Sequence, residues 1–128
     1  MTYRILVTGS RYYTDSATVE AMLREALGTH DPSQVILIHG DAPGLDRLAA
    51  AVAVRLGMTV ESRPADWARH GRAAGPIRNR EMVALGADMC LAFPLGGSQG
   101  TWDCVSVCRQ AGIPVRVIGG NQADGGQE

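Results

Sequence analysis

The chain has 128 residues, a length typical of one globular domain with a single hydrophobic core. Hydrophobic residues make up 45% and charged residues 20% of the sequence, which excludes the composition of a disordered chain. The formal net charge is -1 and all 12 basic residues are arginine, so no overall positive field attracts a polyanion, which argues against nucleic acid as a partner. No apolar run is long enough to span a membrane and no signal peptide is visible, so we expect a cytoplasmic protein without a membrane partner.

Apolar strand segments alternate with stretches of helical periodicity along the chain, and Gly or Pro stands at most of the boundaries. The pattern predicts strands at 3–8, 35–39, 58–63, 88–93 and 113–118. It predicts helices from Asp15 or Ser16 to Gly28, from 45 to 56, from 76 to 86 and from 101 to 111. This alternation is typical of a doubly wound α/β domain, so we expect a mainly parallel five-stranded sheet with about four helices on its two faces.

Two segments depart from this regular pattern. Residues 119–128 are rich in Gly, Gln, Asn and Asp without apolar periodicity, so we expect a domain at 1–118 followed by a flexible tail. The segment 64–75 is longer than the usual connection between a strand and a helix, which predicts a lid or binding loop. This segment carries Asp66, Trp67, Arg69, His70 and Arg72.

The chain has 3 cysteines, Cys90, Cys104 and Cys108. They form no C-x-x-C pair, and no histidine pair at metal-ligand spacing accompanies them. We interpret them as reduced thiols in the core, and we predict neither a disulfide nor a metal site.

Glycine-rich segments follow the first, second and fourth predicted strands. We call these segments the first (9–11), second (40–46) and third (96–101) glycine loops. The carboxyl ends of parallel strands meet at one edge of the sheet, where glycine lets the backbone approach an anion and the next helix offers N–H groups. The sequence therefore predicts a phosphate-bearing ligand, although the loops match neither G-x-G-x-x-G nor the Walker motif, and lysine is absent.

Several of these motifs carry a family resemblance that extends over residues 3 to 118. The third glycine loop, preceded by Arg78-Asn79-Arg80-Glu81-Met82, resembles the signature of the LOG-type nucleotide phosphoribohydrolases. The second glycine loop is similar to one in the DprA and Smf proteins, which belong to the same SLOG superfamily of Rossmann-like domains. The segments 7–11, 64–67 and 74–79 look most like the small YspA or YpsA-related SLOG proteins.

The resemblance implies a Rossmann-like domain that binds a nucleotide or a nucleotide derivative, such as a nucleotide sugar or an ADP-ribose-like molecule. Cys104 stands where the phosphoribohydrolases carry a catalytic glutamate. Asp103 is the preceding residue, and on a helix its side chain points about 100° away from the direction of the Cys104 side chain. A cysteine cannot replace the glutamate carboxylate, so an N-glycosidase or phosphoribohydrolase that uses Arg78 and Asp103 is kept only as an alternative, and no residue is assigned a catalytic role from the sequence. A second alternative is a DprA-like DNA-handling module, which the net charge and the lack of a basic stripe in the sequence disfavour.

The expected site residues each have a structural alternative. Arg78 matches the arginine that contacts the ligand in the phosphoribohydrolases and is expected to hold a phosphate bidentately, unless it pairs with Glu81. Arg11 is expected to contact phosphate or to lie on the solvated surface. Trp67, with His70, either closes over a base or sugar or packs under its own loop.

Acceptors and hydroxyl groups complete the expected site. Asp41 and Asp46 are expected to bind ribose hydroxyls, although Asp46 could instead cap a helix, as could Thr101. His39 ends a strand, which favours a buried histidine with its hydrogen bonds satisfied over a general base. The residues expected to bind the ligand are Gly9, Ser10, Arg11, Gly40, Asp41, Gly44, Asp46, Trp67, Arg78, Asn79, Gly96, Gly97, Ser98, Gly100, Thr101 and Asp103.

The third and fourth predicted helices carry many apolar residues for so small a chain. This excess predicts a homodimer, with apolar side chains at Met82, Val83, Leu85, Val105 and Val107 available for the contact.

Overall fold

The computed structural model describes residues 2–119, and the predicted tail from 120 onward lies outside the described residues. One five-stranded sheet has the strand order β3-β2-β1-β4-β5, and every neighbouring pair is parallel. The strands are β1 (Tyr3–Gly9), β2 (Val35–His39), β3 (Thr59–Ser62), β4 (Met89–Phe93) and β5 (Val115–Val117). The predicted doubly wound, Rossmann-like α/β fold is confirmed, with strand boundaries within about two residues of those expected.

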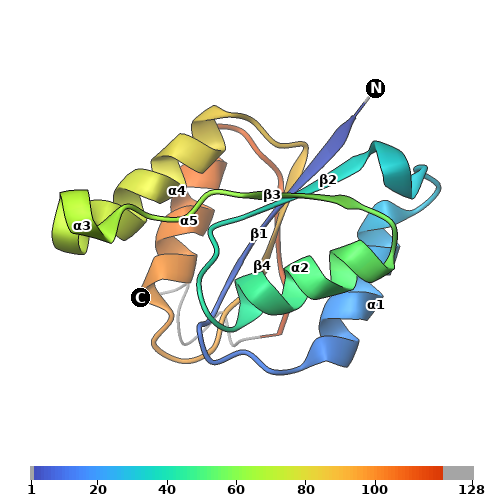
Figure 1. The fold of residues 1–128 in the computed structure, drawn as a ribbon, viewed down its shortest axis with the longest axis horizontal. Helices are drawn as coiled ribbons and strands as arrows, with labels where there is room; N and C mark the ends of the chain where they lie inside the picture. The colour runs from blue at the N-terminus through green and yellow to red at the C-terminus, as the bar shows by residue number, and fades with distance from the viewer. Residues whose placement is uncertain (1, 120–128) are drawn as a thin grey trace.

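Four helices cover the two faces of the sheet. Helices α1 (Ser16–Leu27) and α2 (Leu45–Arg55) lie together on one face, while α4 (Ala74–Ala84) and α5 (Gln99–Gln110) lie together on the other (Figure 1). The remaining elements are the short helix α3 (Trp67–His70) and the 3-10 turns η1 (Pro32–Gln34) and η2 (Gly71–Ala73).

Alternating side chains of the central strand β1 supply both halves of the core. Ile5 and Val7 join the cluster beneath α1 and α2, whereas Leu6 joins the cluster beneath α4 and α5. This period of two is what a strand buried on both faces requires. Cys90, Cys104 and Cys108 are all free and buried in the second cluster, which confirms the interpretation as core thiols.

Most helix boundaries follow the capping residues. The Asp15 side chain accepts a hydrogen bond from the Thr18 N–H at the start of α1, and Gly28, with φ +54°, ends that helix. Helix α5 begins at Gln99 with Ser98 as its N-cap, so the alternative that Thr101 caps this helix is wrong.

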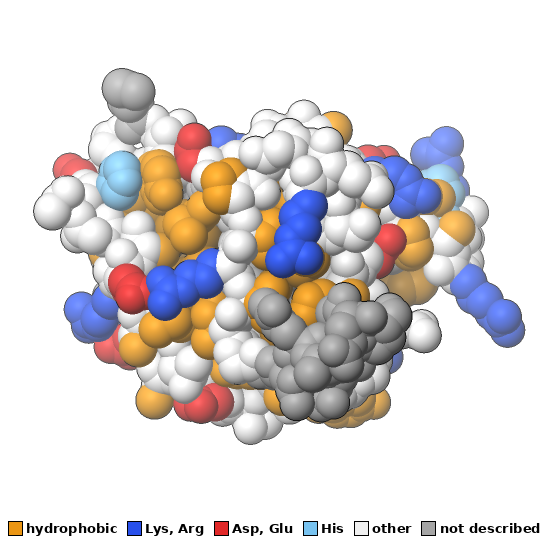
Figure 2. Space-filling view, turned by 180° about the vertical axis from the view of Figure 1, so that it is seen from behind, with side chains coloured by type: hydrophobic (Ala, Val, Ile, Leu, Met, Phe, Trp, Pro, Cys, Tyr) orange, Lys and Arg blue, Asp and Glu red, His pale blue; other side chains and the backbone are white. Residues whose placement is uncertain are grey.

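The segment 64–75 is not the long loop expected from the sequence. Asp66 accepts a hydrogen bond from the Arg69 N–H and thereby starts α3, η2 follows directly, and α4 begins at Ala74 rather than at Pro76. Helix α3 projects from the body of the molecule (Figure 1), and arginine and histidine side chains gather on this projection in the view from behind (Figure 2).

The apolar residues that suggested a homodimer are mostly part of the core. Met82, Val83 and Val105 are buried inside this chain, and Val107 packs against the second core cluster. Leu85 alone among these five is exposed, so the sequence argument for a dimer no longer holds. Within residues 2–119, no helix combines the length and the apolar character that crossing a membrane requires.

Candidate functional site

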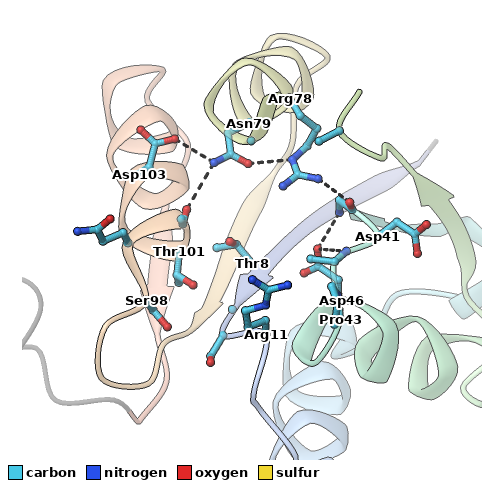
Figure 3. Close-up of a pocket in the computed structure, with 18 of the residues that line it drawn as sticks. Thr8, Arg11, Asp41, Pro43, Asp46, Arg78, Asn79, Ser98, Thr101 and Asp103 are labelled. Atoms are coloured by element: carbon cyan, nitrogen blue, oxygen red, sulfur yellow. Dashed lines mark hydrogen bonds between the residues drawn. The ribbon is translucent and has the colours of Figure 1, made fainter. Parts of the chain in front are cut away.

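A cleft of about 860 Å³ lies at the carboxyl edge of the sheet. The order of the strands reverses between β1 and β4, so the loops after these two strands diverge and leave a crevice. Every residue expected to bind the ligand lines this cleft except Gly44, and Figure 3 labels Arg11, Asp41, Asp46, Arg78, Asn79, Ser98, Thr101 and Asp103 among them. Thr8, Tyr12 and Arg47 also line it without having been expected from the sequence, although Tyr12 directly follows Arg11, and Arg72 lines it from the segment predicted to be a lid or binding loop.

The backbone donors of the second glycine loop are already occupied by side chains of the protein. Asp46 Oδ2 accepts hydrogen bonds from the N–H groups of Gly40 at 3.1 Å and Ala42 at 3.2 Å. His39 Nδ1 accepts a hydrogen bond from the Asp41 N–H at 2.8 Å. Three amides that the sequence suggested for a phosphate therefore have internal acceptors. Asp46 is not the cap of α2 either, because Gly44 occupies that position.

Burial controls the charge of both acceptors. Burial raises the pKa of Asp46 to about 6, although the Ala42 N–H, the Arg78 charge and the Gly40 N–H act in the opposite direction. Burial also lowers the pKa of His39, and the nearby charges of Arg78 and Arg47 add to this effect against that of Asp41. A neutral imidazole has the acceptor that the Asp41 N–H needs, so His39 is the buried, satisfied histidine that we favoured.

The third glycine loop differs in part, because the N–H groups of Ser98 and Gln99 bond to the carbonyl oxygens of Leu95 and Gly97 but those of the next two residues do not. Ser98 occupies the N-cap position of α5, but its Oγ accepts a hydrogen bond from the Leu95 N–H and none from the first turn of the helix. The N–H groups of Gly100 and Thr101, in the first turn of α5, make no hydrogen bond with any described residue. A Cβ atom at Gly96, Gly97 or Gly100 would meet nothing within 4 Å, so this backbone borders open space.

Arg78 and Asn79 connect the second and third glycine loops. Arg78 Nη1 donates to the carbonyl oxygens of Gly40 and of Arg63, the latter at 3.4 Å, and Arg78 Nε donates to Asn79 Oδ1 at 3.0 Å. Asn79 Nδ2 donates to Asp103 Oδ2 at 2.9 Å and to the Gly100 carbonyl oxygen at 3.4 Å. Figure 3 shows this chain of hydrogen bonds along one side of the cleft.

This arrangement changes the expected role of Arg78. Two of its three guanidinium nitrogens have acceptors within the protein, so a bidentate grip on phosphate requires breaking one of those bonds. No ion pair joins Arg78 to Glu81 within residues 2–119, so that alternative is wrong. Arg78 Nη2 has no acceptor among the described residues, and contact of Arg78 with a ligand stays a prediction.

Helix α5 turns Asp103 and Cys104 toward different surroundings. Asp103 is half-buried and lines the cleft, whereas Cys104 is fully buried against the sheet. A hydrogen bond with Cys108 and burial raise the pKa of the Cys104 thiol far above its usual range, so the thiol stays protonated. Cys104 is therefore a core residue, and Asp103 is the carboxylate that α5 presents to the cleft. No group of three or more possible metal ligands occurs within the described part of the chain.

Aromatic and basic side chains form the mouth of the cleft. Tyr12 is 75% exposed and Trp67 is 60% exposed, so Trp67 is not packed under its own segment. Arg11 projects into the middle of the cleft (Figure 3) and makes no ion pair with the described residues. His70, the suggested companion of Trp67, does not line the cleft.

Gly44 has a structural role in place of the expected contact with the ligand. A Cβ atom at this position would lie 2.3 Å from the backbone carbon and oxygen of Arg11, and φ is +79°. The next residue, Leu45, donates its N–H to the Ser10 carbonyl oxygen at 3.0 Å. Gly44 therefore lets the start of α2 pack against the backbone of the first glycine loop.

Comparisons with known proteins place this geometry among relatives. The Gene 61 protein of Mycobacterium phage D29 is 44% identical over 117 residues, which cover 88% of this chain and 93% of the phage protein. DprA from Streptococcus pneumoniae has a TM-score of 0.71 at 18% identity, and the match covers 97% of this chain but only 53% of that protein. DprA from Helicobacter pylori, which was studied for its single-stranded DNA binding mode, has a TM-score of 0.68 at 14% identity over 95% of this chain and 67% of that protein.

The likeness to DprA corrects one expectation from composition. The net charge of -1 argued against nucleic acid as a partner, but a solved protein with this fold binds single-stranded DNA. Net charge therefore does not exclude nucleic acid for this fold, and the inference from composition was wrong. The family model described as "YspA, cpYpsA-related SLOG family" matches residues 3–70, which include the first and second glycine loops. Together with the extensive identity to the phage protein, this match shows that the chain belongs to the YspA, cpYpsA-related SLOG family.

Proposed function

We propose that the cleft binds a nucleotide or nucleotide derivative, with a phosphate against the first turn of α5. The observation that carries this proposal is the pair of N–H groups at Gly100 and Thr101, which make no hydrogen bond with described residues and belong to residues that line the cleft. Backbone donors at a helix start, together with the helix dipole, favour an anion. Ser98 lies beside them and supplies a hydroxyl group.

The charged groups on the two sides of the cleft indicate which end of the ligand lies on each side. Asp41 and Asp46 lie on the side of the second glycine loop, whose amides are already bonded, so a phosphate is disfavoured there. Arg11 approaches from the first glycine loop between this side and α5 (Figure 3). The phosphate therefore belongs between Arg11 and α5, and the sugar hydroxyls belong near the two carboxylates.

The exposed rings of Tyr12 and Trp67 suit the base. Each ring lines the cleft and offers a face on which a base can stack. The proposal covers nucleotides and nucleotide derivatives as a class. Phosphate, sugar and base occur together in a mononucleotide, in a nucleotide sugar and in an ADP-ribose-like molecule.

Substitution of Gly100 by alanine tests the position of the phosphate. Its Cβ would meet no protein atom, and alanine is favoured in a helix, so Gly100→Ala should fold at least as stably as the parent. The added methyl group occupies the space beside the two N–H donors, so nucleotide affinity should fall by about tenfold or more, as expected when a charged hydrogen bond is lost. The matched control is Ser106→Ala on the exposed face of the same helix.

The measurement is titration calorimetry with AMP, ADP, ATP, ADP-ribose and a nucleotide sugar, preceded by a thermal-shift screen. At least one of these compounds should raise the melting temperature of the parent, because a ligand that binds only the folded state stabilises it. If no compound binds the parent, or if Gly100→Ala binds as tightly as Ser106→Ala, the proposed phosphate position is wrong.

The position of Asp103 supports a second candidate, cleavage of the N-glycosidic bond of a nucleotide. Asn79 holds one carboxylate oxygen of Asp103 at 2.9 Å, and a carboxylate beside the sugar can stabilise an oxocarbenium-like transition state. Incubation with nucleoside monophosphates should then release free base, detected by chromatography, and Asp103→Asn should abolish the release. Binding without any release of base would leave the nucleotide-binding proposal and remove this one.

A further inference from the structure

Most arginines without a carboxylate partner among the described residues lie in the first glycine loop or in the segment from α3 to α4. Within residues 2–119, ion pairs join six arginines to carboxylates: Arg4, Arg24, Arg47, Arg55, Arg63 and Arg116. The others are Arg109 on α5 and a group that lies in the first glycine loop or along the segment from α3 to α4, namely Arg11, Arg69, Arg72, Arg78 and Arg80.

The projection formed by α3 and η2, which we call the basic arm, has the strongest local bias. It carries Arg69 and Arg72, both exposed, together with the exposed ring of Trp67. The nearest acidic residue in the chain, Asp66, accepts a hydrogen bond from the Arg69 N–H as the cap of α3. Arginine and histidine side chains stand out from this projection in Figure 2.

The basic arm continues the surface of the cleft. Trp67 and Arg72 line the cleft from the arm, Arg11 lines it from the first glycine loop, and Tyr12 lines it from the position directly after that loop. A ligand that leaves the cleft along the arm therefore meets guanidinium groups and aromatic rings in succession. Phosphates at regular intervals with bases between them have this same chemistry, and a single strand exposes its bases for stacking.

We propose that the basic arm, together with Arg11 and Tyr12, binds a single-stranded nucleic acid of which one nucleotide occupies the cleft. The proposal rests on the nucleotide-binding function proposed above and extends the ligand from one nucleotide to a strand. Arg11, Arg69 and Arg72 contact the backbone phosphates, and Trp67 and Tyr12 stack on bases. The chemistry is shared by DNA and RNA, so the experiment includes both.

Fluorescence anisotropy with labelled 12-nucleotide single strands of DNA and RNA tests the proposal, with unlabelled mononucleotides and duplex DNA as competitors. The strand should bind at least tenfold more tightly than the mononucleotide and more tightly than the duplex. About three phosphate contacts predict that log affinity falls with log salt concentration with a slope of about -2. A preference for DNA or RNA identifies the natural source, and equal binding also supports the shared chemistry.

The variants separate the basic arm from general electrostatics. Arg69→Ala combined with Arg72→Ala should weaken strand binding by more than tenfold and make the salt slope shallower by about 1.4. Trp67→Ala should weaken strand binding by about tenfold through lost stacking. The matched control, Arg24→Ala combined with Arg109→Ala, removes the same two charges near the C-terminal ends of α1 and α5 and should bind like the parent.

The outcomes distinguish this proposal from the proposed function. If mononucleotides bind and the strand binds no more tightly, the basic arm has no role and the nucleotide cleft stands. If the strand binds through Arg69, Arg72 and Trp67 while no mononucleotide binds, the arm is supported and the nucleotide cleft is wrong. If the control variant loses as much affinity as the arm variant, or if duplex DNA competes as well as the strand, the arm proposal is overturned.

Discussion

Removal of the Arg78 side chain should destabilise the fold, in contrast to what its expected place in a ligand site suggested. The guanidinium group donates to the carbonyl oxygen of Gly40 at the end of β2 and to that of Arg63 beyond β3. It also donates to Asn79 Oδ1, on a residue that is only 5% exposed. The contact with Gly40 is so close that a Cβ atom there would lie 2.2 Å from Arg78 Nη1.

The expected magnitude follows from the acceptors that Arg78→Ala leaves without a donor. Gly40 is buried and so is Asn79, and an unsatisfied buried acceptor costs about 1 to 2 kcal/mol. Two such acceptors give a loss of about 3 kcal/mol in the free energy of unfolding, which lowers Tm by about 10 °C for a domain of this size. Arg78→Lys can reach only one of the acceptors and should lose about half as much.

Urea denaturation followed by circular dichroism measures these losses, with Arg80→Ala as the control. Arg80 lies on the same helix and is exposed, and among the described residues its guanidinium donates only to the Pro76 carbonyl oxygen. Its removal should change the free energy of unfolding by less than about 0.5 kcal/mol. If Arg78→Ala is as stable as Arg80→Ala, the hydrogen-bond network does not hold the loops, and Arg78 is available for a phosphate after all.

Three further substitutions test the second glycine loop. The pKa of Asp46 is near 3.8 in the unfolded chain and about 6 in the folded protein, so between these pH values the folded protein holds an extra proton and its free energy of unfolding falls as pH rises. Asp46→Asn should remove this fall, measured by urea denaturation at pH 4 to 7. The lowered pKa of His39 has the opposite effect, because the free energy of unfolding falls as pH drops through 6.5. His39→Asn keeps an acceptor for the Asp41 N–H and should flatten that part of the pH profile. Gly44→Ala should cost about 2 kcal/mol or more, measured as a lower Tm, because its Cβ would collide with the Arg11 backbone at positive φ.

Unchanged pH profiles in the two polar variants would mean that these side chains titrate alike in the folded and unfolded chains. A Gly44→Ala protein with the parent's Tm would show that the first and second glycine loops do not pack as described.

The fold was predictable because its signals are local. The apolar runs at 35–39 and 88–93 gave the strands, and Gly28 marked the end of α1. The convergence of the glycine loops was also predictable, since parallel strands place their carboxyl ends at one edge. Helix α3 was missed because it spans only Trp67–His70, too short for helical periodicity, and depends on the Asp66 cap.

Which glycine loop has N–H donors available for a ligand was not predictable, because this depends on contacts between residues distant in sequence and on the directions of side chains. Nothing in the segment 40–46 indicates that Asp46 turns back to its own loop, or that Arg78, 38 residues later, bonds to Gly40. Only the three-dimensional contacts show that the amides of Gly40, Asp41 and Ala42 have acceptors within the protein, whereas those of Gly100 and Thr101 have none among the described residues. The opposite directions of Asp103 and Cys104 likewise follow from how α5 packs on the sheet.

The hydrogen-bonded chain from Gly40 through Arg78 and Asn79 to Asp103 divides the rim of the cleft into a fixed part and an adjustable part. Because it braces the second glycine loop against α5, the width of the inner cleft is set before any ligand arrives. The basic arm packs mainly on α4 and projects beyond this brace. A small ligand should therefore meet a preorganised cavity and lose little affinity to ordering the protein, whereas a longer ligand bears the entropy of ordering the arm.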